Sequence, residues 1–118
     1  MKPFEMMLNR GIYGSDRISS DSSVEAMTAD QITPEQQALP ASFPGFWDNR
    51  GSGFGVSIML EAGGVPAVAG YFDSYGGYGA SWCADPANDL IGLLMSQRMF
   101  AADPFFDDFW TSVYQATG

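Results

Sequence analysis

The part of this sequence best suited to chemistry is a glycine-rich segment, residues 73–86. It contains the run Gly-Gly-Tyr-Gly at 76–79, continues into a strand-like stretch, and ends in Asp85-Pro86, a pair typical of turns. Because glycine has no Cβ, a strand that opens on glycines lets a ligand or a second backbone approach closely. The segment therefore predicts one wall of a binding site.

The composition excludes several kinds of catalytic site within the chain. The 118 residues contain no histidine, so the usual general base near neutral pH and the commonest metal ligand are missing. A Ser-His-Asp or Cys-His arrangement is therefore excluded. Cys83 is the single cysteine, which rules out an internal disulfide and a cysteine zinc cluster and fits a reducing compartment. We expect no metal and no cofactor.

Charge and hydropathy limit the partners. The net charge is −9 and the pI is near 4.1, so binding to nucleic acid or to an anionic membrane surface is not expected. The sequence has no apolar run of about 18 residues and no apolar signal core at its start, which predicts no membrane span and, by default, a cytoplasmic location. With 46% apolar and 14% aromatic residues, the chain is suited to one small folded domain.

The first 50 residues are predicted to form helices and a loop. Residues 3–9 resemble the end of a helix, with Gly11 as a stop signal. Ser22 and Glu25 have the spacing of a capping box, which predicts a helix over about 23–29. Thr33 followed by Pro34 predicts a further single turn.

An aromatic loop follows these helices. Pro40, Pro44 and Gly45 make the segment irregular, yet it carries Phe43, Phe46 and Trp47, which need burial. Two interpretations stay open: the loop packs over the core, or it forms the rim of a pocket.

Residues 51–98 are predicted to form antiparallel strands. The glycines of 51–55 are interpreted as a strand entrance, because no helix follows them as a dinucleotide-binding loop would require. Residues 54–61 alternate apolar with small or polar side chains, and 66–72 form a second apolar segment. Residues 74–84 and 90–97 would form a hairpin, and the second of these, apolar on both faces, is expected near the centre of a covered sheet.

The clearest predicted element is a C-terminal helix over residues 103–116. Asp103 can cap it, Pro104 suits its first position, and aromatic side chains recur at three- and four-residue steps. Asp103, Asp107 and Asp108 are better explained by capping and a solvated face than by a cation site. The predicted fold class is α+β: an antiparallel sheet of about three to four strands, the terminal helix on one face, and helices at the N-terminal side.

The order of these motifs resembles the C-terminal part of the serine β-lactamase-like hydrolases, which include class C β-lactamases, penicillin-binding-protein-like peptidases and related esterases. The most specific match is residues 76–82, Gly-Gly-Tyr-Gly-Ala-Ser-Trp, followed by Asp85-Pro86 and the strand at 90–97. The weaker matches are residues 4–11, 24–28 and 53–56. The resemblance covers nearly all of residues 1–118 and implies a partial β-lactamase-like fold.

The resemblance implies that residues 74–78 hold the family's third motif, on the strand beside the active site. In relatives this motif includes the forms Trp-Gly-Gly and Trp-x-Gly-Gly. Ser74 occupies the tryptophan position in the longer form and Tyr75 in the shorter, and both alternatives stay open, with Gly76 in the motif either way. A backbone N–H of Gly77 or Tyr78 would then supply one of two donors that stabilise an oxyanion.

The other family motifs are missing. The sequence contains no Ser-x-x-Lys and no Tyr-x-Asn, so we expect no catalytic residue in this chain. The resemblance implies an ester, amide or lactam as the substrate of a parent enzyme, of which this chain would be a fragment, a truncated product or a split subunit. We expect it to be inactive alone and to self-associate or pair with an upstream half. The alternative is a non-catalytic binding or dimerisation module.

Overall fold

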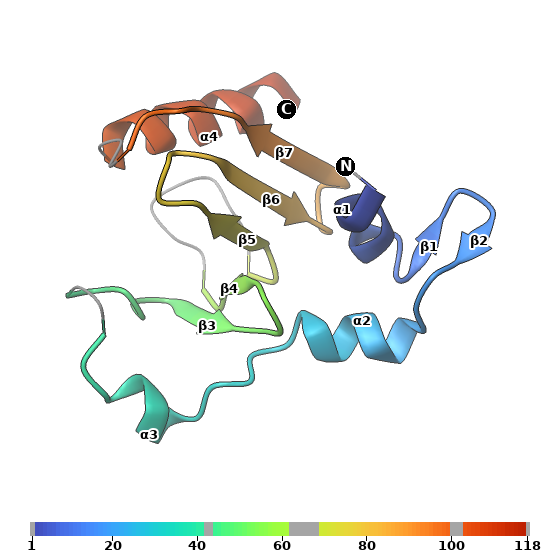
Figure 1. Ribbon diagram of the computed structural model, residues 1–118, viewed down its shortest axis with the longest axis horizontal. Coiled ribbons are helices and arrows are strands. Elements are labelled where there is room, and N and C mark those ends of the chain that lie inside the picture. Colours follow the sequence, from blue (N-terminus) through green and yellow to red (C-terminus); the bar gives the residue numbers. More distant parts are fainter. Residues whose placement is uncertain (1, 42–43, 62–68, 100–102, 118) are drawn as a thin grey trace.

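The computed structural model of the chain describes residues 2–41, 44–61, 69–99 and 103–117. Five antiparallel strands form one sheet in the order β3-β4-β5-β6-β7, with helices on both of its faces (Figure 1). The helices are α1 (Lys2–Leu8), α2 (Asp21–Met27), α3 (Pro34–Gln37) and α4 (Asp103–Thr117). The strands of the sheet are β3 (Arg50–Ser52), β4 (Ser57–Met59), β5 (Phe72–Tyr75), β6 (Ser81–Asp85) and β7 (Leu90–Leu94).

Two apolar cores lie on opposite faces of the sheet. Because successive residues of a strand point to opposite faces, Phe72 and Ala84 pack with α1 and α2, whereas their neighbours Tyr71 and Cys83 pack with Trp110 of α4. The predicted α+β class and the terminal helix on one face are therefore confirmed. The sheet has five strands, one more than the expected upper number.

The interpretation of the glycines at 51–55 as a strand entrance is wrong for Gly51 and holds for Gly53 and Gly55, which precede β4. Gly51 lies inside β3 and pairs with Ile58, while residues 53–56 form the turn that leads into β4. The Cβ of another residue at position 51 would lie 2.3 Å from the Asp30 carboxyl carbon, and Gly55 has a φ of +80°. Close packing and turn geometry explain these glycines.

The boundaries of the central strands also differ from prediction. The segment 74–84 is not one element: β5 ends at Tyr75, a turn follows, and β6 begins at Ser81. The predicted hairpin of β6 with β7 is confirmed, with Ser81 opposite Leu94 and Asp85 opposite Leu90. The expected central place of β7 is wrong: β7 lies at an end of the described sheet, and of its residues only Gly92 is buried. The turn predicted at 62–64 and the start of the segment 66–72 lie outside the described residues.

The N-terminal elements largely follow their sequence signals. The helix start predicted at Thr33-Pro34 is confirmed, and Thr33 caps α3 in a capping box with Gln36 that was not predicted. The α2 helix begins two residues earlier than expected, because Ser20 rather than Ser22 is the N-cap and accepts a hydrogen bond from the Ser23 amide. A short hairpin of β1 (Ile12–Tyr13) and β2 (Asp16–Arg17) was not predicted. The capping role predicted for Asp103 lies outside the described side chains. None of the helices in the described ranges is long and apolar enough to cross a membrane.

A buried carboxyl group attaches α4 to the sheet. Asp85 is fully buried and accepts hydrogen bonds from the Tyr114 hydroxyl at 2.6 Å, from the Asn88 side chain at 2.8 Å and from the Ala87 amide at 3.0 Å. Burial, followed by the hydrogen bond to Asp85, raises the pKa of Tyr114 above its ordinary value. The Asp-Pro pair therefore organises the β6–β7 turn and fixes the terminal helix.

Replacing Tyr114 with Phe should lower the free energy of unfolding by about 1–2 kcal/mol, because a buried acceptor loses a donor. Urea denaturation monitored by circular dichroism measures this loss. Tyr78→Phe is the matched control: its side chain is 68% exposed, so the same chemical change should leave stability unaltered. Equal stability of the Tyr114→Phe variant and the unmodified chain would show that Asp85 does not hold the helix.

Candidate functional site

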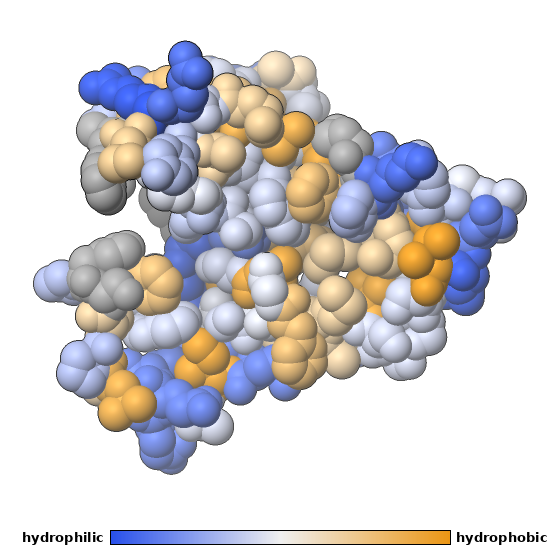
Figure 2. Space-filling model, viewed as in Figure 1, coloured by the Kyte–Doolittle hydropathy of each residue, from blue (hydrophilic) through white to orange (hydrophobic). Residues whose placement is uncertain are grey.

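An open cleft of about 960 Å³ lies between α4, the end of β5 and the loop before β3. Figure 2 shows the molecule hollowed on this side, with hydrophilic residues at the base of the hollow. The glycines of the β5–β6 turn form one part of its wall. The aromatic loop forms another part, because Phe46 and Trp47 both line the cleft and their rings contact each other edge to face at 4.7 Å. The rim interpretation of this loop therefore holds for these two residues, while Phe43 lies outside the described residues.

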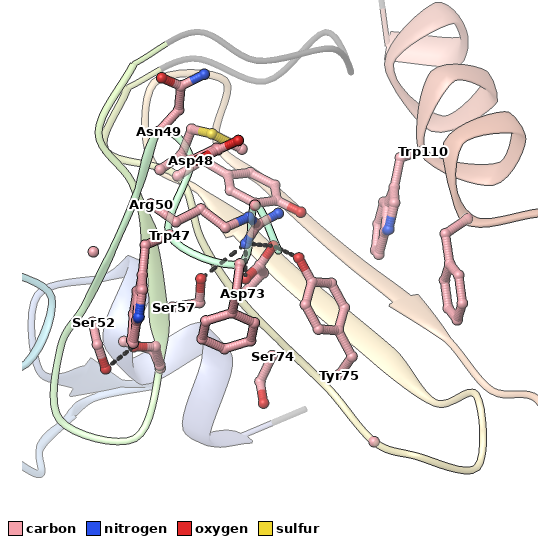
Figure 3. A pocket seen from close by; sticks show the side chains of 18 of the residues that line it. Trp47, Asp48, Asn49, Arg50, Ser52, Ser57, Asp73, Ser74, Tyr75 and Trp110 are labelled. Atoms are coloured by element: carbon pink, nitrogen blue, oxygen red, sulfur yellow. Dashed lines mark hydrogen bonds and ion pairs between the residues drawn. The ribbon is translucent and has the colours of Figure 1, made fainter. Parts of the chain in front are cut away.

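The floor of the cleft is a buried ion pair that joins three strands. Nη1 of Arg50, on β3, donates to both carboxylate oxygens of Asp73, on β5, at 2.9 and 3.0 Å. The same nitrogen donates to the Ser57 hydroxyl of β4 at 2.8 Å. Asp73 is 1% exposed and also accepts from the Tyr75 hydroxyl at 3.2 Å. Figure 3 shows these groups converging on Arg50 from the sheet side of the cleft.

The environment keeps Arg50 charged and oriented. Burial is the largest single influence on the pKa of its guanidinium and lowers it, but the charge and hydrogen bond of Asp73 together with Tyr75 and Tyr71 raise that pKa above the ordinary value. The guanidinium carbon lies 5.3 Å from the centroid of the Tyr75 ring, within the range of a cation–π contact. Charge, hydrogen bonds and stacking thus hold Arg50 in one place on the cleft floor.

The opposite wall is the inner face of α4. Phe106 and Trp110 line the cleft from this helix, and the Phe106 ring lies 6.4 Å from that of Tyr75. Trp110 is 4% exposed, and its indole N–H has no hydrogen-bond partner among the described residues. Its ring fits over Gly92, where an added Cβ would lie 2.2 Å from the Trp110 Cζ3 atom. The absence of a side chain at Gly92 therefore lets the indole reach the sheet.

The five predicted site residues lie at the end of β5 and in the turn after it. Ser74 and Tyr75 are the last residues of β5, and Gly76 and Gly77 continue along the cleft wall. Tyr78 is exposed and does not line the cleft. The Gly76 amide donates to the Ala80 carbonyl at 2.7 Å, which closes the turn. Among the described residues, no acceptor is recorded for the amides of Gly77 and Tyr78.

The turn is held from behind by the chain after β7. Gly79 has a φ of +84°, and a Cβ there would lie 2.6 Å from the Arg98 carbonyl oxygen and 2.7 Å from the Ser96 hydroxyl. Only glycine satisfies both the backbone conformation and this close contact. Gly79 therefore fixes the conformation of the turn that carries the Gly77 and Tyr78 amides.

Among the described residues, no serine of the cleft is hydrogen-bonded to a lysine or to a carboxylate of the cleft. Ser52 donates to backbone carbonyls, and Ser57 accepts from Arg50. Lys2 is the single lysine of the sequence, and its amino group lies over the ring of Tyr13, away from the cleft. The described residues also contain no group of three or more side chains suited to a metal ion. The arrangement can bind and orient a ligand, but these residues alone offer no activated nucleophile.

Arg50 and Asp73 were not found by sequence reasoning. They lie 23 residues apart, and neither belongs to a motif. One signal was present: Asp73 directly follows the aromatic pair Tyr71-Phe72, where a strand enters the core, and a carboxylate at such a position needs a partner. The register of β3 with β4 and of β4 with β5, which brings Arg50 to Asp73, had no such signal.

Stability should fall at alkaline pH because of a buried thiol beneath the cleft. Burial raises the pKa of Cys83 from 9.0 to about 11, and its sulfur is hydrogen-bonded to Tyr71. Between these values the unfolded chain loses the thiol proton and the folded chain keeps it, so the free energy of unfolding should decrease by about 2–3 kcal/mol from pH 9 to pH 11. Urea titrations across this range measure the slope. The Cys83→Ala variant should show a shallower slope, and an unchanged slope would contradict this assignment.

Two curated proteins, both from Mycobacterium tuberculosis, match this chain. The chain is 34% identical over 98 residues to Protein Rv1367c of Mycobacterium tuberculosis strain H37Rv, and equally to Uncharacterized protein MT1414 of strain CDC 1551. Each alignment covers 79% of this chain and 24% of the relative. The chain thus spans about a quarter of the length of the curated relatives that it matches. No family model matches the sequence.

Solved structures decide the fold. EstCE1, described as a hydrolase with promiscuous acyltransferase activity, superposes with a TM-score of 0.72 at 19% identity, over 94% of this chain and 27% of EstCE1. The unliganded simvastatin synthase LovD of Aspergillus terreus gives 0.72 at 22% identity, over 97% of this chain and 33% of LovD. The chain has a partial β-lactamase-like fold. In this β-lactamase-like fold, the cleft is bordered by the glycine-rich turn at 76–79, which overlaps the segment in which the resemblance placed the third motif.

Proposed function

We propose that this chain supplies one wall of the active site of a β-lactamase-like serine hydrolase. The observation that carries the proposal is the β5–β6 turn, which borders the cleft at Gly76 and Gly77 and in which the Gly77 and Tyr78 amides have no acceptor among the described residues. The hydrolase and acyltransferase descriptions of the structural neighbours support it. The nucleophile would come from a segment with Ser-x-x-Lys, which this sequence does not contain.

The proposed chemistry is acyl transfer through a covalent serine intermediate. The serine oxygen bonds to the carbonyl carbon of an ester, amide or lactam while its proton passes to a base of the upstream segment, and the carbonyl oxygen becomes negative. The bond from that carbon to the alkoxy or amino group then breaks, and this group takes up the proton; in a lactam it stays attached to the opened ring. Water hydrolyses the resulting acyl-serine. The backbone N–H of Gly77 or Tyr78 would donate one hydrogen bond to that oxygen, and the serine amide would donate the other. A lost donor of this kind typically reduces the rate by about 100- to 1,000-fold.

Within this proposal, Tyr75 rather than Ser74 takes the tryptophan position of the third motif. Tyr75 shares the α4 face of the sheet with Asp73, because alternate residues of β5 point the same way. Its ring contacts both Arg50 and Phe106 across the cleft. A large ring at this position would border the acyl group beside Gly76 and Gly77.

Complementation tests the proposed function. This chain would be mixed or co-expressed with an upstream segment that carries Ser-x-x-Lys and Tyr-x-Asn, and hydrolysis of a chromogenic short-chain ester would be followed. We expect activity from the combination and none from either part. The matched control mutates the serine of Ser-x-x-Lys to Ala, which should abolish activity. Inactivity of a well-folded combination toward ester, amide and lactam substrates would refute the proposal.

A second function, a binding or dimerisation module, is favoured by one observation. β7 lies at an end of the described sheet, and Leu93 and the following Met95 are 40% and 74% exposed. An apolar strand at a sheet edge is a template for pairing with another chain. Size-exclusion chromatography of the chain with and without the upstream segment separates the two functions. A folded species that self-associates and ignores the segment would favour the module.

A further inference from the structure

Two residues at the base of the cleft, Arg50 and Trp110, have hydrogen-bond donors without an acceptor among the described residues. The Trp110 indole N–H is buried and unpartnered on the α4 wall. On the floor, partners are recorded for Nη1 of Arg50, while its Nε and Nη2 have none among the described residues. Figure 3 shows Trp110 reaching from α4 toward the side of the cleft on which Arg50 and Tyr75 lie. A buried donor without an acceptor is costly, so a ligand that brings acceptors is favoured.

The charges of the cleft disfavour an anionic ligand. The described part of its lining contains one cation, Arg50, and three carboxylates, Asp48, Asp73 and Asp107. Asp73 already neutralises Arg50 at 2.9 Å, so the two exposed carboxylates, Asp48 and Asp107, leave the cleft negative. The whole chain adds to this field with a net charge of −9. A ligand carboxylate would thus meet donors whose positive charge is already balanced.

The remaining walls are aromatic. Trp47 stands on the loop side, Tyr75 on the sheet, and Phe106 and Trp110 on α4. The rings of Tyr75 and Phe106 lie edge to face at 6.4 Å, which leaves an apolar surface on which the body of a ligand can pack.

From these three features we infer that the cleft selects uncharged acyl compounds that carry several oxygen acceptors on an aromatic or apolar body. Trp110 Nε1 and the free N–H groups of Arg50 bind those oxygens, and the rim carboxylates exclude anions such as β-lactam or peptide carboxylates. The inference rests on the proposed function, whose substrate class of esters, amides and lactams it narrows. It also makes α4 part of the ligand site, with Trp110 as its buried donor.

Binding to the chain itself tests the inference without any hydrolysis. The probes are methyl 4-acetoxybenzoate, which is uncharged, and 4-acetoxybenzoate, which differs by one carboxylate. Titration is followed by the indole N–H signals of the three tryptophans in nitrogen-15 NMR spectra, assigned through the backbone. We expect the uncharged ester to move the Trp110 signal and to bind at least about tenfold more tightly than the anion.

Two variants separate the donor from the charge. Trp110→Phe should weaken binding of the uncharged ester about tenfold, whereas Trp82→Phe, on the other face of the sheet, should not change it. The combined Asp48→Asn and Asp107→Asn variant changes only exposed side chains and should improve binding of the anion by about threefold or more, with the ester unaffected. This second variant keeps the test decisive if Trp110→Phe fails to fold.

The inference is overturned if the anion binds as tightly as the ester, if neither binds, or if ester binding leaves the Trp110 signal unmoved. It is also overturned if 4-acetoxyphenyltrimethylammonium binds more tightly than the uncharged ester, because the aromatic walls would then serve a cation. The two hypotheses fail separately. Selective ester binding with an inactive complemented enzyme would refute only the proposed function, and an active enzyme that prefers anionic substrates would refute only the selectivity.

Discussion

Replacing Arg50 with Met is expected to lower the free energy of unfolding by about 3–5 kcal/mol. The Arg50 side chain is 25% exposed, but its partner Asp73 is 1% exposed and would remain as a buried carboxylate without its cation. The Ser57 hydroxyl would lose its donor as well. Chemical denaturation of the chain, followed by circular dichroism, measures this loss.

A matched substitution separates this buried pair from an ordinary surface pair. Arg10→Met removes a salt bridge of 3.5 Å to Asp21, in which the Arg10 side chain is 79% exposed and the Asp21 side chain 56% exposed. This change should lower the free energy of unfolding by at most about 1 kcal/mol. In the double variant, Arg50→Met with Asp73→Leu, most of the lost stability should return, because no buried charge is left unpaired. A cost for Arg50→Met no larger than that for Arg10→Met would mean that the ion pair does not organise the cleft floor.

Gly92→Ala should displace the terminal helix and cost about 1–3 kcal/mol. The new methyl group would lie 2.2 Å from Cζ3 and 2.9 Å from Cη2 of Trp110, and 3.1 Å from the Cys83 sulfur. The indole must move, so the wall of the cleft should open and the fluorescence spectrum of the chain should change. Denaturation and tryptophan fluorescence measure the two effects together.

Gly77→Ala is the control for Gly92→Ala. A Cβ at Gly77 meets no atom within 4 Å, and the substitution keeps the backbone N–H that the proposed mechanism needs. Its stability should stay within about 0.5 kcal/mol of the unmodified chain. If Gly92→Ala were tolerated as well as Gly77→Ala, the packing of Trp110 on the sheet would be looser than the structure indicates.

Local sequence signals predicted the elements that local interactions define. The start signal at Thr33-Pro34, the stop at Gly11 and the aromatic spacing of α4 each act over a few residues, and the structure has those elements. The two-residue period of a strand likewise places Trp82 and Ala84 on one face of β6 and Cys83 on the other. Such signals depend on backbone geometry that neighbouring residues share.

The sequence predicted the glycine-rich wall of the cleft but not its floor, and the reason is physical. The glycine turn at 76–79 is encoded locally, but the Arg50–Asp73 pair depends on the registers of two strand pairings. Those registers are fixed by packing across the sheet, for which a single sequence has no short-range signal. The same reason explains why the place of Gly51 inside β3 was not predicted. A side chain at position 51 would collide with Asp30, which lies 21 residues earlier in the chain.

Labelling with a fluorophosphonate probe tests most directly the claim that this chain is a wall of a serine hydrolase site whose nucleophile lies elsewhere. The chain alone and the chain combined with an upstream Ser-x-x-Lys segment would be treated with the probe and mapped by mass spectrometry. The account predicts no label on the chain alone and a label on the serine of Ser-x-x-Lys in the combination. A label on any serine of this chain, or no label in a folded combination, would contradict it.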